Sequence, residues 1–194
     1  MAGKLEGRKI AFLAADGVEQ VELVEPRKAI EEAGATTELI GLEDGEIQGF
    51  DHLDHADTFK VDKAVKDADP ADYDGLVIPG GVANGDFLRA DEDAVRFTAA
   101  FAEAHKPIAS ICHGPWVLVE AGIVKGRTIT SFPSLRTDVR NAGGTWVDEE
   151  VHVDQGLVTS RKPDDIPAFS AKAIEEFCEG RHEDMPQPAG ATTA

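Results

Sequence analysis

The sequence predicts an α/β fold in which a mostly parallel sheet is covered by helices on both faces. Short apolar runs typical of buried strands alternate along the chain with segments of helical hydrophobic spacing. Several of the apolar runs end in turn-forming residues, such as Asp16-Gly17 and the Pro-Gly-Gly of residues 79–81. A chain of 194 residues suits one domain with a continuous core. We therefore expect one domain over residues 1–180, followed by a disordered tail over residues 181–194.

The first half of the chain predicts three strands, one helix and one excursion from the sheet. The helix covers residues 19–34 and ends at Gly34, despite the proline at position 26. The stretch of residues 46–61 alternates weakly and is rich in Asp and His, which indicates a small peripheral hairpin. The strands are predicted at residues 9–15, 36–42 and 73–81.

The second half of the chain continues the same alternation. Each predicted helix carries apolar residues on one face, and two of them end at a glycine. The last pair of strands flanks an Asp-Gln-Gly turn at residues 154–156. The helices are predicted at residues 91–105, 114–124, 134–144 and 164–180, and the strands at residues 106–111, 127–131 and on both sides of that turn within residues 149–160.

The composition argues against several classes of partner. A net charge of −18 disfavours binding to a nucleic-acid backbone or to an anionic membrane surface. No apolar run approaches the roughly 20 residues that cross a bilayer, and the first one is too short for a signal peptide. We therefore expect a cytoplasmic protein. Its acidic surface indicates either ordinary solvated faces or an adaptation to high salt, and the sequence leaves both open.

The two cysteines, Cys112 and Cys178, provide neither a disulfide framework nor the spacing of a metal site. We accordingly expect no metal and no cofactor. Cys178 lies beside Phe177 late in the last predicted helix, and we expect it to be a buried structural side chain. Cys112 has a different setting, because it directly follows one predicted strand and precedes a helix.

Three stretches lie where predicted parallel strands end: residues 16–19, 79–81 and 112–114. Ligands of open α/β sheets bind outside the carboxyl ends of the strands, so we expect these stretches to form one site. The position of Cys112 resembles that of the nucleophile in a strand–turn–helix elbow. The N-terminus of the following helix favours the thiolate, and backbone N–H groups there could stabilise an oxyanion. We interpret Cys112 as a reactive thiol rather than a buried structural one.

Candidate partners of the thiol come from the same strand ends. A protonated Glu19 would donate a hydrogen bond to the sulfur and supply a proton, and the alternative is a Glu that complements the helix dipole. Gly80 and Gly81 either present N–H donors to a ligand or form a simple tight turn. His113 is either a base for Cys112 or a substrate-binding group, although the side chains of adjacent residues usually point apart.

Four segments together resemble the PfpI intracellular-protease family: ADGVEQVELVEPRKAIEEAG, YDGLVIPGG, IASICHGPWVLVEAGIVKGRTITSFPSLRTDVRNAGGTWVDEEV and GLVTSRKPDDIPAF. That family belongs to a superfamily with the Parkinson-disease-associated protein and the class I glutamine amidotransferases. The resemblance runs from about residue 9 to residue 180. It implies a flavodoxin-like three-layer sandwich in which Cys112 occupies an elbow, Glu19 contacts its thiol and His113 belongs to the active site.

The resemblance also implies three activities, which are peptide hydrolysis, glyoxalase III-type conversion of methylglyoxal to lactate, and removal of early glycation adducts. We expect a stress-protection enzyme that acts on reactive carbonyls, because a small pocket at a strand end suits a small aldehyde. In this hypothesis Gly80, Gly81 and Gly114 bind the substrate or its oxyanion. The alternatives are a PfpI-type cysteine peptidase and a redox sensor or holdase chaperone without significant turnover.

Assembly and amidotransferase activity are the remaining implications. Relatives form homodimers or hexamers, and in some of them an acidic residue from a neighbouring subunit orients the histidine. Asp86 is the nearest match here. The amidotransferase branch uses a distant His-x-Glu element, to which only His152-Val153-Asp154 compares. We interpret His152 as a surface strand position, which makes amidotransferase activity a poor fit.

Overall fold

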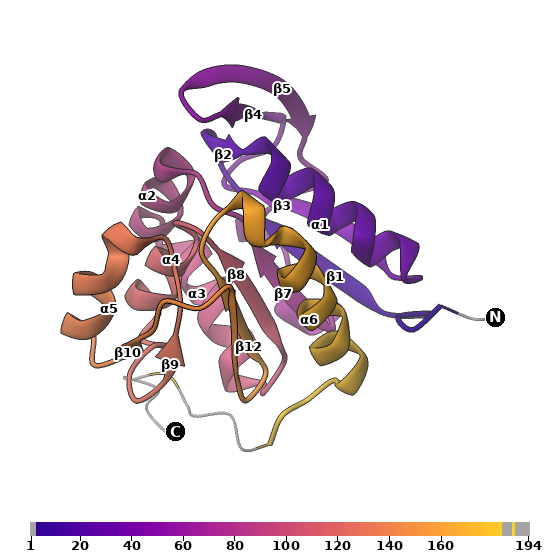
Figure 1. Ribbon diagram of the computed structural model, residues 1–194. Coiled ribbons are helices and arrows are strands. Elements are labelled where there is room, and N and C mark those ends of the chain that lie inside the picture. The colour runs from indigo at the N-terminus through magenta and orange to yellow at the C-terminus, as the bar shows by residue number, and fades with distance from the viewer. Residues whose placement is uncertain (1–2, 184–187, 189–194) are drawn as a thin grey trace.

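A computed structural model describes residues 3–183 and residue 188, and it confirms the predicted α/β fold (Figure 1). Within this part of the chain lies a seven-stranded sheet with the order β11-β12-β8-β7-β1-β3-β6. All neighbouring strands pair in parallel except β11 and β12, which form an antiparallel edge. The strands are β1 (Lys9–Leu13), β3 (Thr36–Gly41), β6 (Lys63–Ala64), β7 (Gly75–Ile78), β8 (Ile108–Ile111), β11 (Val151–Asp154) and β12 (Leu157–Ser160).

The central strands are apolar throughout because both of their faces are covered. Successive side chains of a strand point to opposite faces, so each strand supplies two separate cores. In β1, Ala11 and Leu13 enter one core, whereas Ile10 and Phe12 enter the other. Every residue of β7 and β8 is buried. This pattern explains why the strands appear in the sequence as continuous apolar runs rather than as alternating ones.

Helices cover both faces of the sheet and complete the predicted three-layer sandwich. The core on one face contains residues of α1 and α6, and the core on the other contains residues of α2, α3, α4 and α5. Figure 1 shows α1 and α6 lying together on one side of the sheet. The helices are α1 (Gln20–Glu32), α2 (Val82–Ala90), α3 (Glu92–Glu103), α4 (Pro115–Glu120), α5 (Arg136–Asn141) and α6 (Ile166–Glu179).

The predicted peripheral hairpin is present and stands at one end of the sheet, at the top of Figure 1. It consists of β4 (Glu46–Asp51) and β5 (Asp54–Lys60), and β2 (Val18–Glu19) joins β4 to make a three-stranded sheet. A second small sheet pairs β9 (Thr128–Ile129) with β10 (Thr145–Trp146), so the strand predicted at residues 127–131 lies outside the main sheet. The 3-10 helices are η1 (Val65–Asp67), η2 (Pro70–Asp72), η3 (Pro133–Leu135) and η4 (Pro163–Asp165).

Helix α2 was not predicted, and its sequence contains Asn84-Gly85, a pair typical of turns. Both residues serve packing here. Asn84 is fully buried, and a Cβ on Gly85 would lie 2.7 Å from the carbonyl oxygen of His113. Tertiary contacts therefore override the local turn preference.

The predicted disordered tail of residues 181–194 lies largely outside the described residues. Among the helices that are described, none is long and apolar enough to cross a membrane.

Candidate active site

Cys112 occupies the sharp turn between β8 and α4. Its φ of 61° is left-handed, a conformation that a residue with a side chain rarely adopts and that marks strained functional turns. The backbone around it is fully engaged, since its N–H donates to the carbonyl oxygen of Ser160 at 3.1 Å and its carbonyl accepts from the N–H of Phe132 at 2.9 Å. Only 7% of Cys112 is exposed. The elbow geometry expected for this residue is therefore present.

The carboxyl group that contacts the thiol belongs to Glu22, not to Glu19 as predicted. Glu22 is completely buried and is hydrogen-bonded to the Cys112 side chain. Its Oε2 also accepts the N–H of Gly80 at 2.9 Å. Glu19 precedes α1, and its carboxylate accepts the backbone N–H of His52 at 3.2 Å, in the turn between β4 and β5.

The helical register of α1 explains this correction. Glu22, Pro26 and Ile30 follow at intervals of four residues and are all buried, so Glu22 lies on the face that packs against the sheet. Glu19 is the N-cap position and lies outside that face. The sequence signal for Glu22 was its spacing of four and eight residues from Pro26 and Ile30, which places an acid on the apolar face of the helix. A carboxyl group buried on such a face needs a hydrogen-bond partner.

The pair formed by Glu22 and Cys112 is protonated at rest. Burial, followed by the charge of Glu19, raises the pKa of Glu22 to about 8. Burial and the charge of Glu22 also raise the pKa of the Cys112 thiol, while the N–H groups of Gly81 and His113 act in the opposite direction. The N–H donors of the turn therefore favour the thiolate as predicted, but desolvation outweighs them and the pKa is raised.

His113 contacts the thiol directly, which corrects the expectation that the two adjacent side chains point apart. Its Nδ1 lies 3.1 Å from the Cys112 sulfur, and the left-handed backbone at Cys112 brings the two side chains together. Its Nε2 lies 3.3 Å from the hydroxyl oxygen of Ser134. Burial lowers the pKa of His113, so the ring is neutral at pH 7. A neutral ring that donates from Nε2 to Ser134 leaves Nδ1 free to accept the thiol proton.

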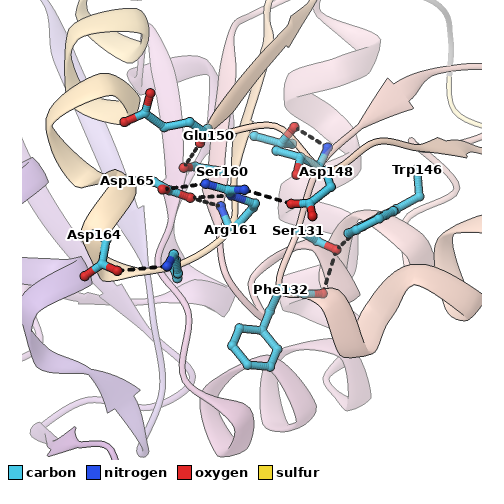
Figure 2. A network of polar contacts seen from close by, with 12 residues as sticks. Ser131, Phe132, Trp146, Asp148, Glu150, Ser160, Arg161, Asp164 and Asp165 are labelled. Carbon is cyan, nitrogen blue, oxygen red and sulfur yellow. Dashed lines mark hydrogen bonds and ion pairs between the residues drawn. The ribbon is translucent and has the colours of Figure 1, made fainter.

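The ring of His113 is held between aromatic side chains. It stacks on Phe132 with ring centroids 4.7 Å apart and an interplanar angle of 26°, and it meets the edge of Trp116 at 5.3 Å. The backbone at Phe132 is fixed in turn, because Trp146 Nε1 donates to the Ser131 hydroxyl at 2.9 Å and that hydroxyl donates to the carbonyl oxygen of Phe132 (Figure 2). These contacts set the orientation of the imidazole.

Replacing Phe132 with alanine should raise the pKa of His113 towards its ordinary value. Removing the stacked ring lets water reach the imidazole, and burial is the cause of the lowered pKa. Titration of the histidine signals by NMR measures this directly. An unchanged His113 titration would show that another group shields the ring.

Gly81 and Asn84 shape the loop that faces the sulfur. Gly81 has a φ of 98°, and its N–H donates to the Cys112 sulfur, as expected for an oxyanion donor. Asn84 connects this loop to the end of β1, because its Oδ1 accepts the N–H of Ala15 at 2.7 Å and its Nδ2 donates to the carbonyls of Pro79 and Gly80. No pattern in the sequence indicated this role for Asn84.

The other two glycines predicted to bind substrate are engaged elsewhere. The N–H of Gly80 donates to Glu22, and the N–H of Gly114 donates to the carbonyl oxygen of Ile111 at 2.9 Å. Neither N–H is free for an oxyanion. Both glycines matter for packing instead, since a Cβ on Gly80 would lie 2.2 Å from Oε2 of Glu22 and one on Gly114 would lie 2.6 Å from the carbonyl oxygen of Ile78.

Asp86 lies on α2 at the rim of the site, where its Oδ1 is 3.6 Å from Nε of Arg89. Its role towards the histidine of a neighbouring subunit stays a prediction. Glu19, which is half-buried, and the exposed Asp51 and His52 form a cluster with potential ligand atoms within 4.8 Å of one another. The cluster has the donor types of a cation site, but its members also contact one another, since His52 Nδ1 lies 2.8 Å from Asp51 Oδ1.

The expected strand-end stretches converge on one cavity of about 630 Å³ with Cys112 in its wall. Gly17, Glu19, Gly81, Cys112 and His113 all line it, which confirms that residues of the three stretches meet. The cavity is not the small pocket that the sequence suggested, and most of its remaining wall is apolar. That wall contains Phe50, Leu53, Val82, Ala83, Phe87, Trp116, Phe132 and Pro163.

The segment that carries Pro163 is fixed by an ion-pair network drawn in Figure 2. Arg161 contacts both oxygens of Asp165, at 2.8 and 3.0 Å, and its Nη1 lies 2.8 Å from Asp148. Asp165 is buried, and a two-pronged Arg–carboxylate contact is geometrically well defined. The network therefore joins the start of α6 to the loop before β11 and holds this edge of the cavity in place.

Cys178 is exposed, so the prediction of a buried structural residue is wrong. The inward face of α6 contains Phe169, Ala173 and Phe177. Each residue of a helix turns about 100° from the one before it, so the residue after Phe177 leaves that face. His152, by contrast, lies on β11 as predicted, with its Nδ1 2.7 Å from Glu149.

Comparison with known proteins places this geometry in a family. A sequence model described as the DJ-1/PfpI family matches residues 8–176. Among similar curated proteins, the putative cysteine protease YraA of Bacillus subtilis is 45% identical over 168 residues, which cover 86% of this chain and 96% of that protein. The deglycase TK1284 of Thermococcus kodakarensis is 42% identical over 167 residues, which cover 86% of this chain and 98% of that protein.

A solved structure shares the fold over nearly the whole chain. It is a two-domain protein from Anabaena variabilis that contains DJ-1/ThiJ/PfpI-like and ferritin-like domains. The TM-score is 0.83 at 28% sequence identity, and the match covers 95% of this chain and 52% of that one.

Proposed function

The chain belongs to the DJ-1/PfpI family, and on that basis we propose that it is a cysteine-dependent enzyme acting on reactive carbonyl compounds. The observation that carries the proposal is the hydrogen-bonded line from Glu22 through Cys112 to His113 at the wall of one cavity. It combines a nucleophile, a neutral base at 3.1 Å and a protonated acid. The relative named as a deglycase supports this chemistry.

The first step is the addition of the thiol to an aldehyde carbon. Nδ1 of His113 accepts the thiol proton as the sulfur forms a bond to that carbon, and the carbonyl electron pair moves onto oxygen. The N–H groups of Gly81 and His113 point at the sulfur and are placed to stabilise this oxygen. Glu22 then gives it a proton, which yields a neutral hemithioacetal and a carboxylate.

The second step applies to a 2-oxoaldehyde. The Glu22 carboxylate removes the hydrogen of the former aldehyde carbon as a proton while the His113 imidazolium gives its proton to the ketone oxygen, which produces an enediol. Glu22 then returns its proton to the neighbouring carbon, and the hydroxyl group on the sulfur-bearing carbon loses its proton to the Glu22 carboxylate. The resulting thioester is hydrolysed by water, so that the thiol is regenerated and a 2-hydroxy acid leaves. The balance is one 2-oxoaldehyde and one water consumed for each 2-hydroxy acid formed.

The two other functions considered for this chain are supported less directly. Oxidation as a redox sensor favours a low-pKa thiolate, whereas burial raises the pKa of Cys112. A peptidase uses the same nucleophile and base, and a relative bears the name of a putative cysteine protease. An experiment therefore has to distinguish peptide cleavage from the conversion of reactive carbonyl compounds.

Wild type and the Cys112→Ala variant should be compared on methylglyoxal and on a fluorogenic peptide. We expect the wild type to convert methylglyoxal to lactate, and the variant to lose about 10³-fold in kcat/KM, because the covalent step needs the sulfur. Cys178→Ala is the matched control, since this thiol is exposed on α6, and it should retain wild-type activity. Wild-type consumption by Cys112→Ala would overturn the mechanism, and cleavage of the peptide alone would identify a peptidase.

A further inference from the structure

The shape and polarity of the cavity define what the substrate carries besides its carbonyl group. The cavity of about 630 Å³ has room for roughly 20 water molecules at ~30 Å³ each. A dicarbonyl compound as small as methylglyoxal would leave most of this space unfilled. Ligand sites of this size, about 300–1,000 Å³, usually enclose most of a larger ligand.

The exposed apolar side chains of the molecule gather at this cavity. Among the described residues, the large hydrophobic side chains that are exposed are Val21, Val24, Leu53, Val82, Phe87 and Phe132. The last four line the cavity, and Leu53 is 91% exposed. Apolar surface open to water is unfavourable, so its concentration around a reactive thiol points to a ligand group that covers it.

Three separate segments provide this apolar wall. Leu53 comes from the turn between β4 and β5, Phe87 comes from α2, and Phe132 precedes η3. In Figure 1 the hairpin and α2 stand at the same end of the sheet. A group attached to the carbonyl carbon that Cys112 attacks would therefore extend between them.

The ionised carboxylates at the cavity are those of Glu19 and Asp86, since Glu22 is protonated. No lysine or arginine is among the described residues that line it, and the exposed His52 on the rim is paired with Asp51, its Nδ1 lying 2.8 Å from that carboxylate. The nearby Arg89 is committed elsewhere, with Nε 3.6 Å from Asp86 and its guanidinium carbon 5.1 Å from the Trp116 ring centroid. A carboxylate on the substrate would be repelled by Glu19 and Asp86 and would find no lysine or arginine among the described lining residues.

We infer that the substrate is an uncharged 2-oxoaldehyde bearing an aryl or branched alkyl group, which lies against Leu53, Phe87 and Phe132. This inference rests on the proposed function for the carbonyl chemistry. The size of the cavity and its apolar wall favour the aryl or branched alkyl group, and the carboxylates of Glu19 and Asp86 disfavour 2-oxo acids. Phe87 and Leu53 are then residues that determine specificity rather than catalytic ones.

A turnover experiment compares phenylglyoxal with methylglyoxal. We expect the wild-type kcat/KM to be about tenfold higher for phenylglyoxal, because the phenyl ring buries more apolar surface against the cavity wall than a methyl group does. Phe87→Ala should lose most of this preference, which is measured as the ratio of the two kcat/KM values. Val24→Ala removes a hydrophobic side chain that is 36% exposed on α1 outside this cavity, and it should keep the preference.

A binding experiment removes the dependence on turnover. In the Cys112→Ala variant, calorimetry should show that 2-hydroxyacetophenone binds about tenfold more tightly than hydroxyacetone, which has a methyl group in place of the ring. Benzoylformate, an anion with the same ring, should bind at least about tenfold more weakly than 2-hydroxyacetophenone.

The outcomes separate this inference from the proposed function. Equal affinity for the two ketones, or tight binding of benzoylformate, overturns the inference, and so does Cys112-dependent turnover without preference for phenylglyoxal. If a second copy of the chain covers the apolar rim, the phenyl ketone and the methyl ketone should bind with equal affinity. Selective binding of the phenyl ketone without turnover of either aldehyde would support the inferred group and overturn the carbonyl chemistry.

Discussion

Replacing Glu22 with glutamine is expected to lower kcat/KM on 2-oxoaldehydes by about 10²- to 10³-fold while the chain stays folded. Glutamine keeps the size of the side chain and a hydrogen-bond donor to the sulfur but has no proton to transfer, and general acid–base catalysis typically contributes about 10²–10⁴-fold. The carboxyl group is completely buried beside the thiol. Steady-state kinetics, with circular dichroism to verify the fold, tests this.

Glu19→Gln is the matched control. It removes a carboxyl group from the rim of the same cavity, three residues earlier in the chain. The charge of Glu19 contributes to the raised pKa of Glu22, so its removal should lower that pKa and move the pH–rate profile to lower pH. Its kcat should stay within about fivefold of the wild type. Equal losses in the two variants would contradict the assignment of the acid to Glu22.

The same group makes stability depend on pH with a defined sign. Glu22 titrates near 4.5 when the chain is unfolded and at about 8 when it is folded. Between these values the folded state holds a proton that the unfolded state has lost, so this group lowers the free energy of unfolding as pH rises towards 8. Denaturant titrations of wild type and Glu22→Gln should diverge over this range, by an amount on the order of a few kcal/mol at pH 8 in favour of the variant.

Replacing Gly81 with alanine should destabilise the protein by about 3 kcal/mol or more and abolish activity. A Cβ there would lie 2.1 Å from the carbonyl oxygen of Gly17 and 2.7 Å from the backbone N of Glu19. Both are backbone atoms, which cannot move aside as a flexible side chain can. The Glu19 N–H also donates to the Gly80 carbonyl oxygen, so moving the two loops apart would break this hydrogen bond. The φ of 98° adds strain of about 1–3 kcal/mol.

Gly126→Ala separates strain from steric clash. Gly126 also has a positive φ, at 76°, but nothing lies within 4 Å of an added Cβ. We expect a loss of about 1–2 kcal/mol and unchanged activity. Thermal and urea unfolding of both variants provide the comparison. A Gly81→Ala protein as stable as Gly126→Ala would mean that the loops at Gly17 and Gly81 separate more easily than their contacts suggest.

The layered fold and the place of the site follow from local patterns. Continuous apolar runs such as residues 106–111 occur because both faces of the sheet are buried, and the structure buries all of β8. Polar stretches at the ends of parallel strands meet because those ends share one edge of the sheet. Cys112 was recognisable as a candidate nucleophile because its setting, a strand before it and a helix after it, is encoded in adjacent residues.

The local patterns failed where long-range contacts decide. The Asn84-Gly85 pair indicates a turn, yet packing against His113 makes it part of α2. Cys178 was expected inside because Phe177 is buried beside it, but the docking face of α6 turns it outward. The cavity is larger than expected, because Leu53, Phe87 and Phe132 line it from three distant segments that no local signal joins.

The sequence alone therefore determined the sandwich, the converging strand ends and the cysteine, since each depends on the periodicity or identity of neighbouring residues. Only the tertiary structure decided which carboxyl group meets the thiol. Glu19 and Glu22 both lie near the start of α1, and the choice depends on how that helix docks on the sheet. The contact between Cys112 and His113 likewise required the left-handed backbone at Cys112, which hydrogen bonds to Ser160 and Phe132 hold in place.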